Sequence, residues 1–140
     1  MAKRKVKGNT VTKILRTGLK LIQKGWAQGA EFKYANGVEI DESDLTAVKR
    51  ATNFCAIGAV NVQGFLKAGL TKTHVALARL DEATRLVTRE TRKTNDDQGI
   101  YFGESEFDDV VEYNDVPGRK KAQIVAVYKK AISLQTHRSA

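Results

Sequence analysis

FCAIGAV, residues 54–60, is the stretch from which the fold is best read. It is small, apolar and uncharged, and it contains the only cysteine of the chain. Thr52 and Asn53 precede it and are good helix N-caps, so the run predicts the first turn of a helix that reaches about Lys67. Alanine and glycine leave room for another helix to approach closely. The run therefore indicates either a tight helix-packing seam or an exposed thiol at a helix start, and the rest of the chain favours the seam.

Hydrophobic spacing on both sides of this run predicts further helices. The first helix is expected from residue 10 or 12 to 24, the second from 41 or 43 to a break near 53, and a third from 71 or 73 to 92. A short turn or helix is expected over 105–113 and a last helix over 119–134. Asn36-Gly37, flanked by Glu31–Tyr34 and Val38–Ile40, is a strong two-residue hairpin signal. Gly25 is expected to end the first helix in the left-handed conformation. The predicted fold is mainly α (α+β), one compact domain of about four to five helices with a short β-hairpin near residues 31–40.

The domain organisation follows from length and composition. At 140 residues the chain fits one domain. We expect a basic, flexible N-terminal arm over 1–9, a helical domain over 10–134 and a C-terminal tail over 135–140. No apolar stretch is long enough to span a bilayer, and no signal peptide is recognised. One cysteine excludes an internal disulfide, so we expect a cytoplasmic protein.

The charge is unevenly distributed. The chain has 24 basic and 16 acidic residues, a formal net charge of +8. Eight of the acids lie in residues 94–118, which contain no base, so eight acids remain against all 24 bases elsewhere. Such a distribution predicts a basic surface that could meet phosphate and an acidic edge that would repel it, although solvated helix faces give the same composition.

A catalytic role would have to centre on Cys55. A thiolate nucleophile needs a base, usually histidine, and an orienting group, for which His74 and Asp115 are the candidates. Free cysteine is more often a small buried hydrophobe, and the local sequence lacks an oxyanion setting. One cysteine and two scattered histidines cannot form a zinc site, and no calcium loop or phosphate-binding glycine loop is present. We therefore expect no metal, no cofactor and, on balance, no enzyme.

Nucleic-acid binding rests on charge alone. A flexible basic arm followed by a basic helix face would hold phosphate without reading sequence. No aromatic RNA-binding motif or zinc finger is found. The candidate nucleic-acid-binding residues are Lys3, Arg4, Lys5, Lys7, Lys13, Arg16 and Lys20.

Spaced signature residues point to a family. Gly25-Trp26, the run from Phe54 to Ala59, and Tyr113-Asn114-Asp115 before an amphipathic last helix together resemble an uncharacterised domain family of bacteriophages and actinobacteria. The resemblance covers roughly residues 12–134. The chain departs from that family by having Tyr113 in place of tryptophan and by an inserted stretch over 99–108.

The resemblance implies a shared fold and a phage-like origin, with no assigned activity. The signature residues then suit structural roles: Trp26 as an anchor, Cys55 and Gly58 in packing, and Asn114 with Asp115 capping the last helix. The function expected from the whole sequence is a small non-enzymatic phage-type accessory protein that binds a host or viral macromolecule, protein or nucleic acid. The alternatives are a nucleic-acid-associated protein using the basic arm and helix face, and a cysteine-dependent enzyme centred on Cys55.

Overall fold

The structure, a computed structural model, describes residues 10–64, 70–94 and 108–139. The described elements are α1 (Thr10–Lys24), β1 (Phe32–Lys33), α2 (Leu45–Val48), β2 (Asn53–Phe54), α3 (Gly58–Gln63), α4 (Leu70–Thr94), α5 (Asp108–Asp115) and α6 (Lys121–Ser139). The mainly α single domain is confirmed, with six helices instead of four to five. The arm over 1–9 lies outside the described residues. The last helix continues to Ser139, beyond the boundary expected at residue 134.

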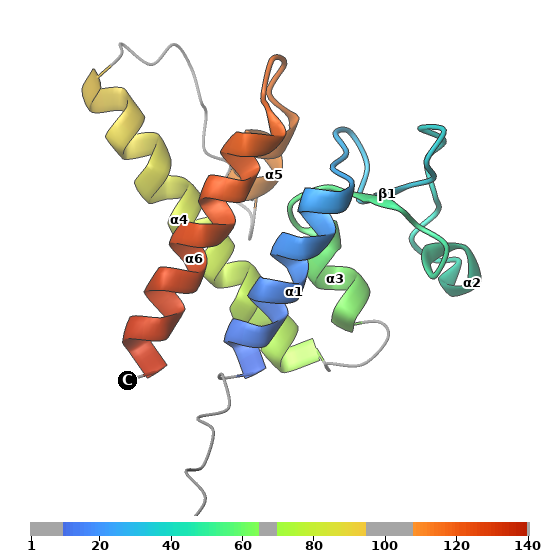
Figure 1. The fold of residues 1–140 in the computed structure, drawn as a ribbon, viewed down its shortest axis with the longest axis horizontal. Helices are drawn as coiled ribbons and strands as arrows, with labels where there is room; N and C mark the ends of the chain where they lie inside the picture. Colours follow the sequence, from blue (N-terminus) through green and yellow to red (C-terminus); the bar gives the residue numbers. More distant parts are fainter. Residues whose placement is uncertain (1–9, 65–69, 95–107, 140) are drawn as a thin grey trace, which may run out of the picture.

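The helices form two layers. In Figure 1, α1 and α6 run side by side in opposite directions in front of α4, and α3 lies beside α1. The shorter α5 packs against α4. Tyr128 of α6 is fully buried at the α1–α6 contact, where a Cβ atom on Gly18 would lie 2.7 Å from its ring. Gly18 therefore permits the close approach of α1 and α6.

The first helix follows its sequence pattern. Ile14, Leu15 and Ile22 are buried against the core, and the exposed side carries Lys13, Arg16 and Lys20. Because residues three and four apart lie on one side of an α-helix, the apolar and basic residues separate cleanly into two faces. The same spacing that buries the helix thus leaves a row of basic side chains in solvent.

The predicted hairpin is present, with Lys33 bridged antiparallel to Glu39, and its first strand also pairs with a strand outside the hairpin. Gly37 has a φ of 87°, and the amide of Tyr34 donates to the carbonyl of Val38, as the Asn36-Gly37 signal predicts. The two named strands are β1 and β2, which pair antiparallel with Phe32 opposite Phe54. Their rings meet edge to face at a centroid distance of 6.1 Å. This aromatic contact across the sheet stabilises the pairing of β1 with β2, two strands that are distant in the sequence.

Two glycines have roles that differ from the expected ones. Gly25 is not left-handed; a Cβ there would lie 2.3 Å from the carbonyl oxygen of Thr52. A Cβ on Gly58 would lie 2.2 Å from the carbonyl oxygen of Glu31. Both glycines admit the backbone of another segment, so the close approach at Gly58 is made by the chain before β1 and not by a second helix. The helix also begins at Gly58, three residues after the cysteine.

Candidate functional site

The Cys55 thiol lies inside the core between β2 and α3. Its side chain is 5% exposed, and its sulfur accepts a hydrogen bond from the amide of Gly58 at 3.4 Å. The backbone amide of Cys55 donates to the carbonyl oxygen of Glu31 at 3.1 Å. The residue is therefore held on both its backbone and its side chain.

The surroundings of this thiol keep it protonated. Burial raises the pKa of Cys55 to about 12, the amides of Gly58 and Ile57 act in the opposite direction, and the charges of Glu31 and Asp115 add to the increase. His74 is exposed on α4 and is not among the groups that shift this pKa. Because the thiolate is the nucleophilic form, a thiol with this pKa is unreactive at neutral pH. The structure brings Asp115 toward Cys55, where its charge opposes ionisation.

Asn114 connects three separate segments through its side-chain amide. Asn114 lies in the last turn of α5, and only 1% of its surface is exposed. Its Oδ1 atom accepts from the indole Nε1 of Trp26 at 2.8 Å and from the amide of Ala56 at 2.9 Å. Its Nδ2 atom donates to the carbonyl of Ala27 at 3.0 Å and to Oδ1 of Asp115 at 2.9 Å. Both donors and both acceptor positions of the amide are used, which is the full capacity of an asparagine side chain.

The residues beside Asn114 extend these bonds to the loop after α1. Oδ1 of Asp115 also accepts from the amide of Gly29 at 3.0 Å. Nε2 of Gln28 donates to the carbonyl oxygens of Asn114 at 2.9 Å and of Val116 at 3.0 Å. We call the set Trp26, Gln28, Ala56, Asn114 and Asp115 the Asn114 network. It replaces the expected role of Asn114 and Asp115 as caps of the last helix.

The last helix joins this region through Tyr128. Its hydroxyl donates to the carbonyl oxygen of Ala56, whose amide is bound by Asn114. Both backbone polar groups of Ala56 are therefore satisfied by side chains from α5 and α6. Sequence reasoning identified Trp26, Asn114 and Asp115 but missed Gln28 and Tyr128, because a glutamine in a loop and a tyrosine in a helix stripe carry no sequence signal for such bonds.

An acidic hollow lies near the turn that follows β1. It has a volume of about 470 Å³ and is lined by Ala30, Glu31, Glu39, Ile40, Asp41 and Glu42. The carboxyl of Glu31 hydrogen-bonds to Glu42 and accepts from Nδ2 of Asn61. Burial, followed by the hydrogen bond to Glu42, raises the pKa of Glu31 to about 7. Within residues 10–64, 70–94 and 108–139, no three histidine, cysteine, aspartate or glutamate side chains are placed to hold a metal ion.

The expected nucleic-acid-binding residues divide into two groups. Lys13, Arg16 and Lys20 are exposed along α1, as predicted. The residues Lys3, Arg4, Lys5 and Lys7 lie outside the described part of the chain. Sequence reasoning missed that α6 lies beside α1 and adds further exposed lysines, because the pairing of two helices distant in sequence is not visible in either helix alone.

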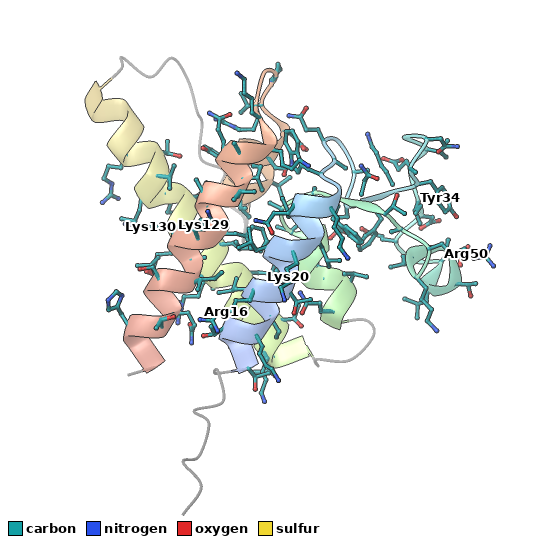
Figure 2. The ribbon with its side chains drawn as sticks, in the orientation of Figure 1. Arg16, Lys20, Tyr34, Arg50, Lys129 and Lys130 are labelled. Carbon is teal, nitrogen blue, oxygen red and sulfur yellow. The ribbon has the colours of Figure 1, made fainter. Side chains whose placement is uncertain are left out.

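The exposed sides of α1 and α6 form one surface, which we call the α1–α6 face. Nζ of Lys121 donates to the carbonyl of Gln23 at 3.0 Å, which links the end of α1 to the start of α6. Figure 2 shows Arg16 and Lys20 on α1 beside Lys129 on α6. Neither helix contains an aspartate or glutamate. The exposed basic residues of the face are Lys13, Arg16, Lys20, Lys24, Lys121 and Lys129.

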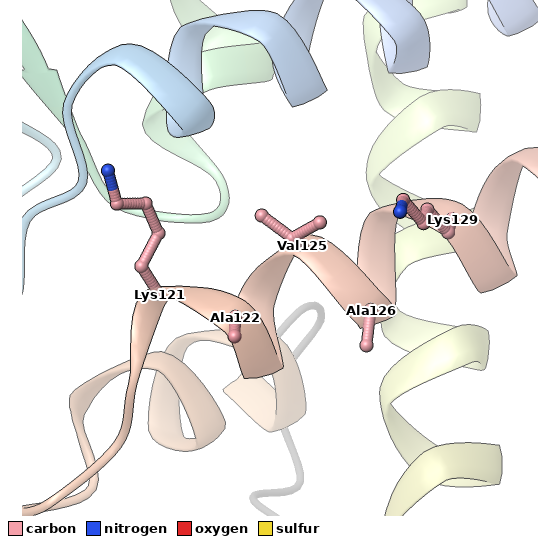
Figure 3. A pocket seen from close by; sticks show the side chains of 5 residues that line it. All are labelled: Lys121, Ala122, Val125, Ala126 and Lys129. Atoms are coloured by element: carbon pink, nitrogen blue, oxygen red, sulfur yellow. The ribbon is translucent and has the colours of Figure 1, made fainter.

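An open hollow lies on this face along α6. Its volume is about 470 Å³, and it is lined by Lys121, Ala122, Val125, Ala126 and Lys129. In Figure 3, Lys121, Val125 and Lys129 project from the same side of the helix. The hollow therefore has a floor of small apolar side chains with a lysine at each end.

Comparison with known proteins gives one family. The family model described as "Family of unknown function (DUF6197)" matches residues 6–134. No curated protein and no solved structure matches the chain. None of the helices described here is both long enough and apolar enough to cross a membrane.

The first prediction concerns the thiol. Iodoacetamide at pH 8 is expected to leave Cys55 unmodified in the folded protein, because the thiol is buried and its pKa is about 12. The same reagent should label it completely in concentrated guanidinium chloride. Mass spectrometry measures both, and the unfolded protein is the internal control because Cys55 is the only cysteine. Rapid stoichiometric labelling under native conditions would restore the cysteine-dependent enzyme as a candidate.

The second prediction concerns the Asn114 network. Asn114→Ala leaves the indole of Trp26 and the backbone groups of Ala27 and Ala56 without their partners. Each buried polar group left unpaired costs about 1–3 kcal/mol, so the free energy of unfolding should fall by roughly 3–5 kcal/mol in urea titrations. The matched control is Asn36→Ala in the exposed turn, expected to cost about 1 kcal/mol or less. Equal losses for the two variants would contradict the structural role of the network.

The third prediction concerns Glu31. Its native pKa of about 7 lies above the ordinary value of 4.5. At a pH between these two values, the native state therefore keeps a proton on Glu31 that the unfolded chain has lost. The contribution of Glu31 to the free energy of unfolding should therefore be fully present below about pH 4.5 and should be lost as the pH rises through about 7. After allowance for solvent screening at this half-buried site, the fall is roughly 1–2 kcal/mol.

Glu31→Gln is expected to remove this fall, since an amide cannot ionise. The control is Glu39→Gln, an exposed residue of the same hollow, which should keep the pH dependence of the unmodified protein. Urea unfolding between pH 4.5 and 8 measures both variants. A pH dependence in Glu31→Gln that matches the unmodified protein would show that Glu31 does not titrate in this way.

Proposed function

The chain belongs to the DUF6197 family of unknown function, and we propose that it is a small non-enzymatic accessory protein of phage type that binds an anionic host or viral macromolecule. The phage-type origin is inferred from the signature residues around Trp26, Cys55 and Asn114. The single cysteine suits a reducing compartment, so the proposed place of action is the host cytoplasm.

The observation that carries this proposal is the α1–α6 face. Two adjacent helices present exposed lysine and arginine residues and contain no acid. Arg16 and Lys20 form no ion pair with any residue in the described ranges, so their charges remain available to a partner. A surface of one sign of charge attracts partners of the opposite sign and increases the rate of association.

The chemistry of the core supports binding over catalysis. The thiol of Cys55, the strongest candidate nucleophile in the sequence, is buried and has a pKa of about 12. Asn114 and Asp115 hold the backbone of neighbouring segments through hydrogen bonds. The polar signature residues Asn114 and Asp115 are therefore used to maintain the fold, whereas the exposed bases of α1 and α6 form one surface on two helices without acids.

The fourth prediction tests this proposal with the full-length protein immobilised on a resin. From host lysate at about 0.1 M salt it should retain a macromolecule that elutes as the salt is raised toward about 0.5 M, because exposed charges are screened. The double variant Arg16→Gln/Lys20→Gln should lose that macromolecule. Gel electrophoresis of the eluates, with and without prior nuclease treatment, measures the result.

A matched control is available on the opposite side of the molecule. Lys49→Gln/Arg50→Gln removes the same charge from exposed residues at α2, and Figure 2 shows Arg50 far from α1 and α6. This variant should retain the macromolecule. Two results would overturn the proposal: no macromolecule retained by the unmodified protein at low salt, or equal losses in the two double variants.

A further inference from the structure

The geometry points to duplex nucleic acid as the partner of the α1–α6 face. We propose that its sugar–phosphate backbone lies across α1 and α6, with one ridge of the backbone in the hollow between Lys121 and Lys129. This inference rests on the proposed function and names the class of its partner. It assigns a role to α6 that no feature of the sequence alone suggested.

The spacing of the basic residues suits a repeating anion. Lys13, Arg16 and Lys20 lie on one side of α1, and at 1.5 Å per residue they extend over about 10 Å. Along one strand of a duplex, phosphates recur about every 3.4 Å of helix axis, so this row lies opposite about three of them. Lys121 and Lys129 on α6 are separated by about 12 Å on the same reckoning. Two rows of cations on neighbouring helices therefore match an extended polyanion better than a single anionic group.

The floor of the hollow permits close approach. Ala122 and Ala126 are exposed but end at Cβ, and Val125 is half-buried between them. A convex sugar–phosphate ridge can therefore approach the helix while the long side chains of Lys121 and Lys129 reach phosphates at either end. Lysine is a compact charge on a flexible stem, so these contacts hold the backbone without reading bases.

A duplex is favoured over a single strand because the face has no aromatic side chain for stacking. Proteins that bind single strands stack successive bases on aromatic rings. The α1 segment contains no phenylalanine, tyrosine or tryptophan, and the one such residue in α6, Tyr128, is fully buried. A duplex has its bases already stacked and offers only phosphates and grooves to such a surface.

The same composition makes a protein or a membrane a poorer partner. Stable protein interfaces depend on large buried anchors such as tryptophan, tyrosine and arginine in pockets, and membrane-surface helices insert large apolar side chains. The large hydrophobic residues that are exposed in the described part of the chain are Val38 and Leu45, which lie near the turn and α2. The hollow on the α1–α6 face offers only alanines and a half-buried valine between its lysines.

The fifth prediction uses a fluorescent duplex DNA of about 20 base pairs and the single strand of the same sequence. Anisotropy titrations of the full-length protein from about 50 to 200 mM salt should give a log–log slope that reports the number of phosphates neutralised, about 0.9 for each. Duplex affinity should exceed single-strand affinity at every salt concentration. Lys129→Gln and Arg16→Gln should each reduce the slope by about 0.9.

The decisive variant is Ala126→Glu, which places a carboxylate on the floor of the hollow. Ala126 is exposed and glutamate is a good helix former, so the fold should be kept, as thermal unfolding by circular dichroism will show. We expect duplex affinity at about 100 mM salt to fall by about tenfold or more. The matched control, Ala35→Glu at the exposed turn, has the same change in charge and should alter affinity by less than about twofold.

Three outcomes would overturn the inference. One is equal loss of affinity in Ala126→Glu and Ala35→Glu, which would mean that the duplex binds by net charge or elsewhere. Another is tighter binding of the single strand. The third is retention of a nuclease-resistant macromolecule from lysate, dependent on Arg16 and Lys20, without duplex binding. This last result would leave the proposed function intact and replace its partner with an acidic protein.

Discussion

The buried side-chain amide of Asn114 is the interaction on which the arrangement of this domain depends. It joins the end of α5 to the loop after α1 and to the segment between β2 and α3, through partners that are 58 to 88 residues from Asn114 in the chain. Helices alone satisfy their own backbone, whereas these loops carry polar groups that need partners when buried. One asparagine side chain binds three of those groups, the indole of Trp26, the carbonyl of Ala27 and the amide of Ala56. Gly25 and Gly58 allow loop backbones to approach closely, because a Cβ at either position would overlap a carbonyl oxygen.

This constraint also determines what the cysteine can do. Ala56, bound by Asn114 at its amide and by Tyr128 at its carbonyl, follows Cys55 directly, so the thiol is fixed beneath two helices. The charge of Asp115, which the network needs for the amide of Gly29, raises the pKa of the same thiol. Of the two groups that the sequence offered as helpers of the cysteine, Asp115 therefore opposes thiolate formation, and His74 is not among the groups that shift the pKa of the thiol. A cysteine, an asparagine and an aspartate can be brought together by the requirements of folding alone.

Residues that act within one helix or turn could be predicted, and residues that act between segments could not. The two faces of α1 and the turn at Gly37 follow from local spacing and backbone preference, and both are found. Phe32 accepts from the amide of Ile40 on the hairpin side and also pairs with Phe54, and this second pairing depends on the packing of two rings from distant segments, so local signals cannot reveal it. Likewise Gly58 looks the same in sequence whether a helix or a backbone carbonyl approaches it. The lysines of α6 belong to a larger basic surface because α6 packs beside α1, and neither helix shows this contact in its own sequence.

Net charge is therefore a poor guide to the surface of this protein, because its charges are used unequally. In the described part of the chain, Asp81 and Asp109 are buried and both pair with Arg85, which joins α4 to α5. Asp115 is bound within the Asn114 network. These three acids thus hold neighbouring elements together, whereas the bases of α1 and α6 project from a surface with no acid in either helix. The charges of Asp81 and Asp109 are partly compensated by Arg85, so these two acids act mainly to hold α4 and α5 together. Exposed bases on two adjacent helices that contain no acid are therefore expected to give the α1–α6 face a positive potential. The fold concentrates this potential by the way it pairs its helices.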